Sequence, residues 1–324
     1  MFDWYKFDMV KPIDKNSKIL IGLGDGFVNG HGACSNELWE KCNWDLNNVT
    51  HDNIKEYQMS FYKNSWVHKI CENYMTEYIP INMGITGVGN RGAVKELYLH
   101  PELNIESAAE KVVVFMLSDF EKFDFIHREY FEHIHFETIQ PILNQSTSKR
   151  ELWDSFTKHA YSDRGGLIET LLAIAEAKTW CKAHNATLLL TSSTRYEYNH
   201  DYFVKTILED CECDKGRTPN YLLDRPTYVG TIANFISWED FFRPAGHHCL
   251  TDYLLELENK DILMNTKYSE KYYDYSYGLE KLSENGYITN SSYPSENGHE
   301  KIANIISNHI THLKNKKPIK NKKK

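Results

Sequence analysis

The sequence predicts an α/β fold, a three-layer α/β/α sandwich around a parallel sheet of about five strands. Short apolar runs typical of buried strands recur along the chain, and segments with helical periodicity separate them. Such alternation is typical of a parallel sheet with helices on both faces. The 324 residues are 41% apolar and 25% charged, which allows a packed core and excludes global disorder.

The first half of the chain contains three predicted strands. The apolar run 18–24 ends in glycine, as a parallel strand entering a turn would. The run 78–82 contains Pro80, which has no amide hydrogen and therefore fits an edge strand or a strand start. The run 112–117 predicts a fully buried strand, and residues 37–75 predict a mixed helical stretch between the first two strands.

The second half adds one strand and two helices. Apolar periodicity predicts a helix over 166–184, followed by a strand over 186–191. Residues 300–313 predict an amphipathic helix with its isoleucines facing inward.

Two stretches interrupt this alternation. Residues 121–164 are acidic, aromatic and histidine-rich, and residues 195–285 are rich in tyrosine. We predict that both are insertions into one domain spanning 1–312 and that they form an aromatic cap. Such insertions would cover the strand ends, where α/β proteins place ligands.

The charge is distributed unevenly along the chain. Seven of the 37 basic residues are lysines in 314–324, which leaves 30 basic against 45 acidic residues in the remainder. We predict that 313–324 is a solvated, disordered basic tail. Because the body is acidic, we expect no nucleic-acid binding except through that tail.

Nothing in the sequence predicts secretion or a membrane anchor. No stretch approaches the ~20 uninterrupted apolar residues of a membrane span. The start of the chain carries Asp3 and Asp8 in place of a basic segment followed by an apolar block. Seven cysteines, an odd number, favour reduced thiols, so we expect a cytosol-like compartment.

The second glycine-rich turn satisfies a dinucleotide-binding fingerprint. Gly87, Gly89 and Gly92 have the spacing G-x-G-x-x-G, in which backbone amides hold a pyrophosphate at a helix N-terminus. Asp119 follows the next strand, as the acidic residue of that motif would. The fingerprint normally follows the first strand, however, so nucleotide binding remains an alternative here.

Four short segments together carry a family resemblance. They read G-D-G-F-V-N-G at 24–30, N-M-G-I-T-G at 82–87, L-S-D-F-E-K-F-D at 117–124 and N-S-S-Y-P-S-E-N-G-H-E-K-I-A at 290–303. In order and spacing they resemble the SGNH (GDSL-type) hydrolase family, especially the divergent version common in tailed phages. That family has G-D-S-x-x-x-G, N-x-G-x-x-G and D-x-x-H-P-x-x-x-G-H-x-x-I-A, and the resemblance implies its flavodoxin-like sheet.

The resemblance implies that the catalytic residues have been lost. Gly26 stands at the position of the nucleophilic serine, Tyr293 at the base histidine and Asn290 at the orienting carboxylate. Ser118 stands where an oxyanion-hole asparagine is usual, so only Gly87 of the four namesake residues remains. A phenol with a pKa near 10 accepts protons poorly at neutral pH. The pattern therefore predicts an inactive relative, a pseudoenzyme that needs no cofactor.

We predict that a degenerate binding site remains at the same place. Its expected lining residues are Asp25, Gly26, Gly87, Gly89, Asn90, Ser118 and Tyr293. Asp25 is expected to cap a short helix, and the amides of residues 26 and 87 to bind a carbonyl or small anion. A glycan or another phage or host protein is the expected partner, in the virion or the host cytoplasm, with tyrosines as contact surface.

An active esterase or deacetylase on an O-acylated carbohydrate remains an alternative. Cys34, Ser35 and Ser118 are the nearest candidate nucleophiles, with His31 or His299 as base. In the family the second histidine belongs to the terminal helix, so we expect His299 to be structural.

Metal chemistry is not expected. Histidines and cysteines cluster at 127–135, 211–213 and 246–249, but none of these clusters has H-E-x-x-H or C-x-x-C spacing.

Overall fold

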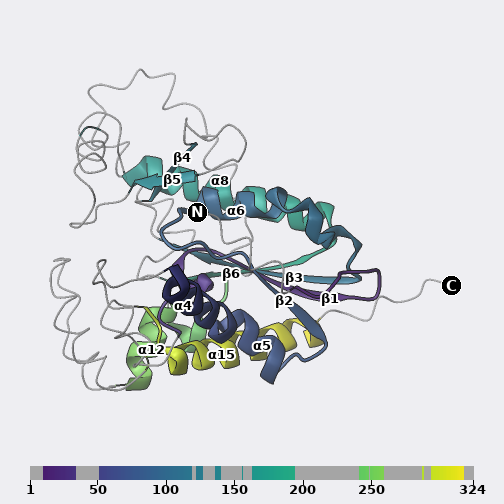
Figure 1. Cartoon of the computed structure of the whole chain (residues 1–324). Helices are drawn as coiled ribbons and strands as arrows, with labels where there is room; N and C mark the ends of the chain where they lie inside the picture. Colours follow the sequence, from purple (N-terminus) through teal and green to yellow (C-terminus); the bar gives the residue numbers. More distant parts are fainter. Residues whose placement is uncertain are drawn as a thin grey trace.

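A parallel sheet between two helical layers forms the centre of the structure, a computed structural model (Figure 1). The structure describes residues 10–33, 51–118, 122–126, 136–139, 155, 163–193, 241–247, 249–258, 287 and 293–316. The sheet has the order β2-β1-β3-β6, and every pair in it is parallel. Its strands are β1 (Lys18–Leu23), β2 (Tyr78–Asn82), β3 (Glu110–Leu117) and β6 (Thr187–Ser192). The predicted α/β fold is confirmed.

Helices cover both faces of the sheet. One face carries α6 (Asn90–Leu99) and α8 (Asp163–Ala183), and the other carries α5 (Trp66–Asn73) and α15 (Glu296–Lys316) (Figure 1). The helix α4 (His51–Asn64) precedes α5, so the predicted helical stretch is confirmed from residue 51 onward. Two single 3-10 turns, η1 (Pro101–Leu103) and η2 (Ile105–Ser107), lead from α6 into β3.

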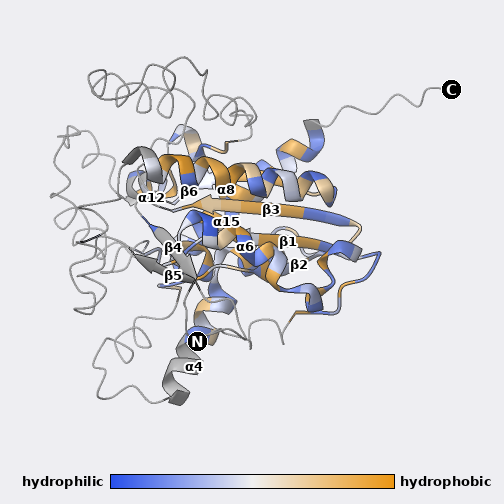
Figure 2. Cartoon of the chain, turned by 90° about the horizontal axis from the view of Figure 1, so that it is seen from above, coloured by the Kyte–Doolittle hydropathy of each residue, from blue (hydrophilic) through white to orange (hydrophobic). Residues whose placement is uncertain are grey.

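The strands are apolar because both of their faces are covered. Residues 112–117 of β3 are buried, and Figure 2 shows β1 and β3 as apolar bands between helices that alternate in hydropathy. One buried cluster packs under α6 and α8 and includes Leu97, Leu171 and Trp180. A second packs under α5 and α15 and includes Trp66 and Ile306.

The two edges of the sheet differ. Among the described residues β2 pairs only with β1, so Pro80 lies in an edge strand, as predicted. Beyond β6, Phe241 forms an isolated parallel bridge with Leu190, and the amide of Phe242 donates to the Leu190 carbonyl at 2.7 Å. Four strands and this single bridge are therefore described where about five strands were predicted.

The terminal helix is longer than predicted. It begins at Glu296 and continues to Lys316, so the predicted boundary of the domain at residue 312 falls inside a helix. Lys314 explains the extension, because its ammonium lies 2.8 Å from a Glu110 carboxylate oxygen and 4.3 Å from the centre of the Tyr78 ring. The predicted disordered tail thus does not begin at 313.

Parts of both predicted insertions are described. In the first, β4 (Phe123–Ile126) and β5 (Phe136–Ile139) form an antiparallel pair. In the second, η4 (Pro244–Gly246) precedes α12 (Leu250–Glu258), whose Leu250 and Leu254 are buried in the cluster under α5 and α15. This part of the second insertion therefore packs into the main core. The tyrosine-rich stretch 268–277 lies outside the described residues.

Among the described helices, none is both long and apolar enough to cross a bilayer.

Candidate functional site

The first glycine-rich turn folds into a four-residue helix, α2 (Gly26–Asn29), directly after β1. The Oδ1 atom of Asp25 accepts the amide hydrogen of Phe27 at 3.1 Å, so Asp25 caps this helix as predicted. Gly30 ends the helix in a left-handed conformation, and its amide donates to the Gly26 carbonyl at 3.1 Å. The turn therefore forms a short helix that is capped at both ends, although its first residue, Gly26, has no hydroxyl group.

Close backbone approach explains two glycines of this turn. A Cβ on Gly24 would lie 2.5 Å from the Met116 carbonyl oxygen, and one on Gly30 would lie 2.2 Å from the Phe61 carbonyl oxygen. Both glycines also have positive φ, at 147° and 95°. Their roles are structural.

Asp25 has a second partner that the sequence did not predict. Its Oδ2 atom lies 2.6 Å from the Lys122 ammonium, and the side chains of Asp25 and Lys122 are only 4% and 9% exposed. Lys122 follows β3, 97 residues along the chain. The first turn is thus tied to the start of the first predicted insertion by a buried ion pair.

The ring of Tyr293 fills the space beside Gly26. If residue 26 had a Cβ, that atom would lie 2.5 Å from Tyr293 Cε1 and 3.2 Å from its hydroxyl oxygen. Real Cβ atoms do not approach carbon so closely, so a side chain at position 26 would require the Tyr293 ring to shift. Gly26 and Tyr293, which the sequence resemblance pairs with the nucleophile and base of the SGNH motif, are therefore in direct contact.

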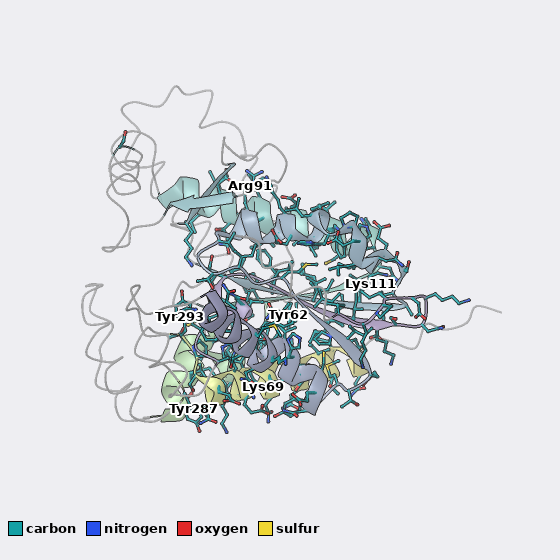
Figure 3. The ribbon with its side chains drawn as sticks, viewed as in Figure 1. Tyr62, Lys69, Arg91, Lys111, Tyr287 and Tyr293 are labelled. Carbon is teal, nitrogen blue, oxygen red and sulfur yellow. The ribbon has the colours of Figure 1, made fainter. Side chains whose placement is uncertain are left out.

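Tyr293 also contacts two aromatic neighbours. Its ring centre lies 4.3 Å from that of His31 in an edge-to-face arrangement and 5.7 Å from that of Phe27. His31 in turn contacts Phe61 at 4.9 Å. Tyr293 lies on the side of the sheet that carries α5 and α15, whereas Arg91, at the start of α6, lies on the other side (Figure 3).

His31, a candidate base, is neutral at pH 7. Burial lowers the pKa of its imidazole to about 4, although the nearby charge of Asp25 acts in the opposite direction. A neutral imidazole can accept a proton; this ring lies against the aromatic rings of Tyr293 and Phe61 and near the Asp25 carboxylate.

The second glycine-rich turn packs directly on the first. The amide of Ile85 donates to the Gly24 carbonyl at 3.0 Å, and the Asn29 side chain donates to the Thr86 hydroxyl at 2.9 Å. Asn82, which matches the family motif, donates to the Val28 carbonyl at 2.7 Å. The motif residue Asn82 therefore holds the two turns together. Gly87 has a φ of 86° and no heavy atom within 4 Å of where its Cβ would be.

Two predicted binding residues, Asn90 and Ser118, bind each other. The Ser118 amide donates to Asn90 Oδ1 at 2.8 Å, and the Asn90 amide group donates to the Ser118 carbonyl and the Thr170 hydroxyl, each at 3.1 Å. Both are buried, at 4% and 1% exposed. Because both side-chain hydrogens of Asn90 and the Ser118 amide are already used, neither residue offers these groups to a ligand, contrary to the prediction. Gly89 precedes α6 as its N-cap.

His299 has the structural role that was expected. Its ring is 0% exposed, and Nδ1 accepts the amide hydrogen of Trp66 at 3.2 Å. Burial lowers its pKa to about 3, so the ring is neutral with its hydrogen on Nε2. It anchors α15 to α5 rather than acting as a base.

A serine and a histidine approach each other beneath this site. Ser65 Oγ lies 3.2 Å from His68 Nδ1, a distance also found in nucleophile–base pairs. Ser65 is 0% exposed, however, and its hydroxyl donates to the Tyr62 carbonyl at 2.9 Å. The pair lies at the start of α5, closed to substrate.

The structure describes only some of the remaining candidate residues. Cys34, Ser35 and Asn290 lie outside the described residues. Within the described ranges, no group of three histidine, cysteine or acidic side chains is placed to hold a metal ion. His247 pairs with Glu256, and Cys249 is buried.

No family profile and no curated sequence matches the chain. Among solved structures it is similar to a carbohydrate esterase described as having divergent catalytic and non-catalytic binding functions, at 11% identity over 95% of this chain and 70% of the other, with a TM-score of 0.37. It is also similar to the acetylxylan esterase Axe2 of Geobacillus stearothermophilus, at 12% identity over 93% of this chain and 96% of the other, with a TM-score of 0.36. A third similar structure is the acetyl xylan esterase Est2A of Butyrivibrio proteoclasticus, at 12% identity over 62% of this chain and 53% of the other, with a TM-score of 0.29. Values this low assign no function to the chain.

Proposed function

We propose that this chain is an SGNH hydrolase-like protein of the tailed-phage type that has lost catalysis and serves as a binding or virion-associated module. One observation carries the proposal: the Tyr293 ring occupies the space in which a nucleophile on residue 26 would stand. Ester hydrolysis by this family's chemistry needs a hydroxyl, a base and an oxyanion site. The first two are replaced here by bare backbone and a phenol.

The surrounding packing supports loss of chemistry without loss of fold. Asp25 still caps α2, Asn82 still joins the two turns and His299 still anchors α15. Each of these roles contributes to stability, so each persists when selection for turnover ends. The side chains that would serve only the reaction are the ones replaced.

The ligand we propose is a glycan or another phage or host protein. Tyrosine rings give large contact area with little loss of entropy, and the chain has 21 tyrosines. The amides of residues 26 and 87 are the proposed donors for a carbonyl or small anion. Acetate titrated to well above a roughly millimolar dissociation constant should perturb the amide NMR signals of both glycines.

Reaction with an ester and a serine-directed probe tests the absence of catalysis. We expect no stoichiometric labelling by a fluorophosphonate and no turnover of p-nitrophenyl acetate. Ser65→Ala is the matched control, because it removes the buried serine beside His68 and should change neither result. Stoichiometric labelling, or turnover abolished by one serine or histidine substitution, would establish the active-esterase alternative.

The nucleotide alternative has its own readout. The Gly87–Gly92 segment does lead into a helix, α6, which begins at Asn90, as that fingerprint requires. We expect no thermal shift with NAD or ATP. A shift that disappears in Gly89→Ala would favour nucleotide binding instead.

A further inference from the structure

The space that the Tyr293 ring fills has three defined sides. The backbone of Gly26 lies against one ring edge, with Cε1 and Cζ 2.5 Å and 3.1 Å from where a Cβ would be. The Phe27 ring lies at an interplanar angle of 53°, and the His31 ring at 76°. Tilted and edge-to-face contacts of this kind are the favourable geometries of aromatic pairs.

We propose that Gly26, Phe27 and His31 form a binding slot for one phenolic ring, which Tyr293 occupies as a built-in ligand. We call this the Tyr293 slot. The inference rests on the proposed function, in that it requires a residue without a side chain at position 26.

Two features make the slot able to accept a ring from solution. Tyr293 is partly exposed, so a ring can enter without unfolding of the chain. His31, which lines the slot, is neutral at pH 7 because burial lowers its pKa to about 4. A ring that enters the slot therefore does not have to remove water from a charged imidazolium. A slot whose lining side chains remain packed after its occupant is removed can bind a molecule of the same shape.

The built-in occupant also competes with free ligands for the slot. A tethered ring competes with free ligand at an effective concentration in the millimolar range or above. The unsubstituted chain should therefore bind free phenols at least about tenfold more weakly than a chain without the Tyr293 ring. An external aromatic ligand gains access only by displacing this side chain.

The test uses Tyr293→Gly and p-cresol, which reproduces the tyrosine side chain. We expect millimolar p-cresol to raise the Tm of this variant by about 2 °C or more. The unsubstituted chain and Tyr74→Gly should not respond, since Tyr74 is 39% exposed on α5's C-terminal end. The saturated analogue 4-methylcyclohexanol should give a smaller shift because it lacks an aromatic face.

A second substitution checks the location of binding. Gly26→Ala in the Tyr293→Gly background places a methyl group in the slot and should weaken p-cresol binding at least about tenfold. If Tyr293→Gly does not fold, refolding with p-cresol should restore soluble protein. Absence of any shift or rescue, or an equal shift in Tyr74→Gly, would overturn the slot. These outcomes are independent of fluorophosphonate labelling, so the slot and the proposed loss of catalysis can fail separately.

Discussion

Asp25 and Lys122 form a buried ion pair with 2.6 Å between carboxylate oxygen and ammonium nitrogen. The same aspartate caps α2 through its other oxygen. One carboxylate therefore shapes the first turn and attaches it to the segment after β3.

Breaking this pair should destabilise the fold. Lys122→Met leaves the Asp25 carboxylate buried without its cation and should lower the free energy of unfolding by about 3–5 kcal/mol. Urea unfolding measures the effect. The double substitution Asp25→Asn with Lys122→Met removes both charges, keeps a capping oxygen and should recover much of the loss. A change below about 0.5 kcal/mol in Lys122→Met would contradict the buried pair.

Gly26 and Tyr293 should be energetically coupled. Gly26→Ser places a Cβ 2.5 Å from Tyr293 Cε1 and should cost about 1–3 kcal/mol, whereas the same change in a Tyr293→Gly background should cost little. A double-mutant cycle measures the difference. Gly87→Ala is the control, because its φ of 86° causes strain that does not depend on Tyr293. Additive effects would contradict the contact.

Restoring the three family residues should create activity. With Gly26→Ser, Tyr293→His and Asn290→Asp together, we expect p-nitrophenyl acetate hydrolysis about 10²-fold above the matched triple variant that has Gly26→Ala. The histidine also removes the phenol ring that lies against position 26. A folded triple variant with no gain would mean that oxyanion donors or substrate access are missing as well.

Acid should destabilise this protein through its buried histidines. Burial lowers the pKa of His31 and His68 to about 4 and that of His299 to about 3, from about 6.5 when unfolded. The unfolded chain binds more protons between these values, so stability is complete above pH 6.5 and falls as pH decreases toward 4. Each histidine contributes a slope of up to about 1.4 kcal/mol per pH unit.

His299→Asn provides the comparison for this pH dependence. Its Oδ1 replaces the acceptor for Trp66 but does not titrate. Urea unfolding at pH 7.5, 6 and 5 should therefore show a shallower decline for the variant than for the unsubstituted chain. Parallel curves would indicate that His299 has the same pKa in the folded and unfolded chain, contrary to its burial.

The C-terminal lysines should differ in their effect on stability. Ending the chain at His312 removes the contacts of Lys314 with Glu110 and Tyr78 and the packing of Leu313, and should cost about 1–2 kcal/mol. Ending it at Lys316 keeps α15 whole and should change the free energy of unfolding by less than about 0.5 kcal/mol. Equal losses in both truncations would show that 317–324 also stabilises the fold.

Local signals account for the features that could be predicted from sequence. The apolar runs of β1, β3 and β6 identify strands because their faces are both covered, and Pro80 identifies an edge. Asp25 before a short helix and glycines at positive φ follow equally from residue type. Each of these depends on a few neighbouring residues.

The features that were missed depend on tertiary distances. Lys122 lies 97 residues from Asp25, and nothing in its local sequence distinguishes it from a surface lysine. Asn90 and Ser118 are polar, as ligand-binding residues are. Only the structure shows that they form hydrogen bonds with each other. The motif resemblance paired Gly26 and Tyr293 with the nucleophile and base positions of the SGNH motif, but it did not predict that the Tyr293 ring lies against Gly26.

The edge position of β2 has a consequence for self-association. An exposed strand edge offers main-chain donors and acceptors to a strand of another molecule, and fibril growth begins in this way. In β2 the central residue is Pro80, aligned with Leu20 of β1, and it has no hydrogen to donate. Among the described residues, this edge of the sheet therefore carries a proline midway along it, which opposes edge-to-edge pairing of one copy with the next.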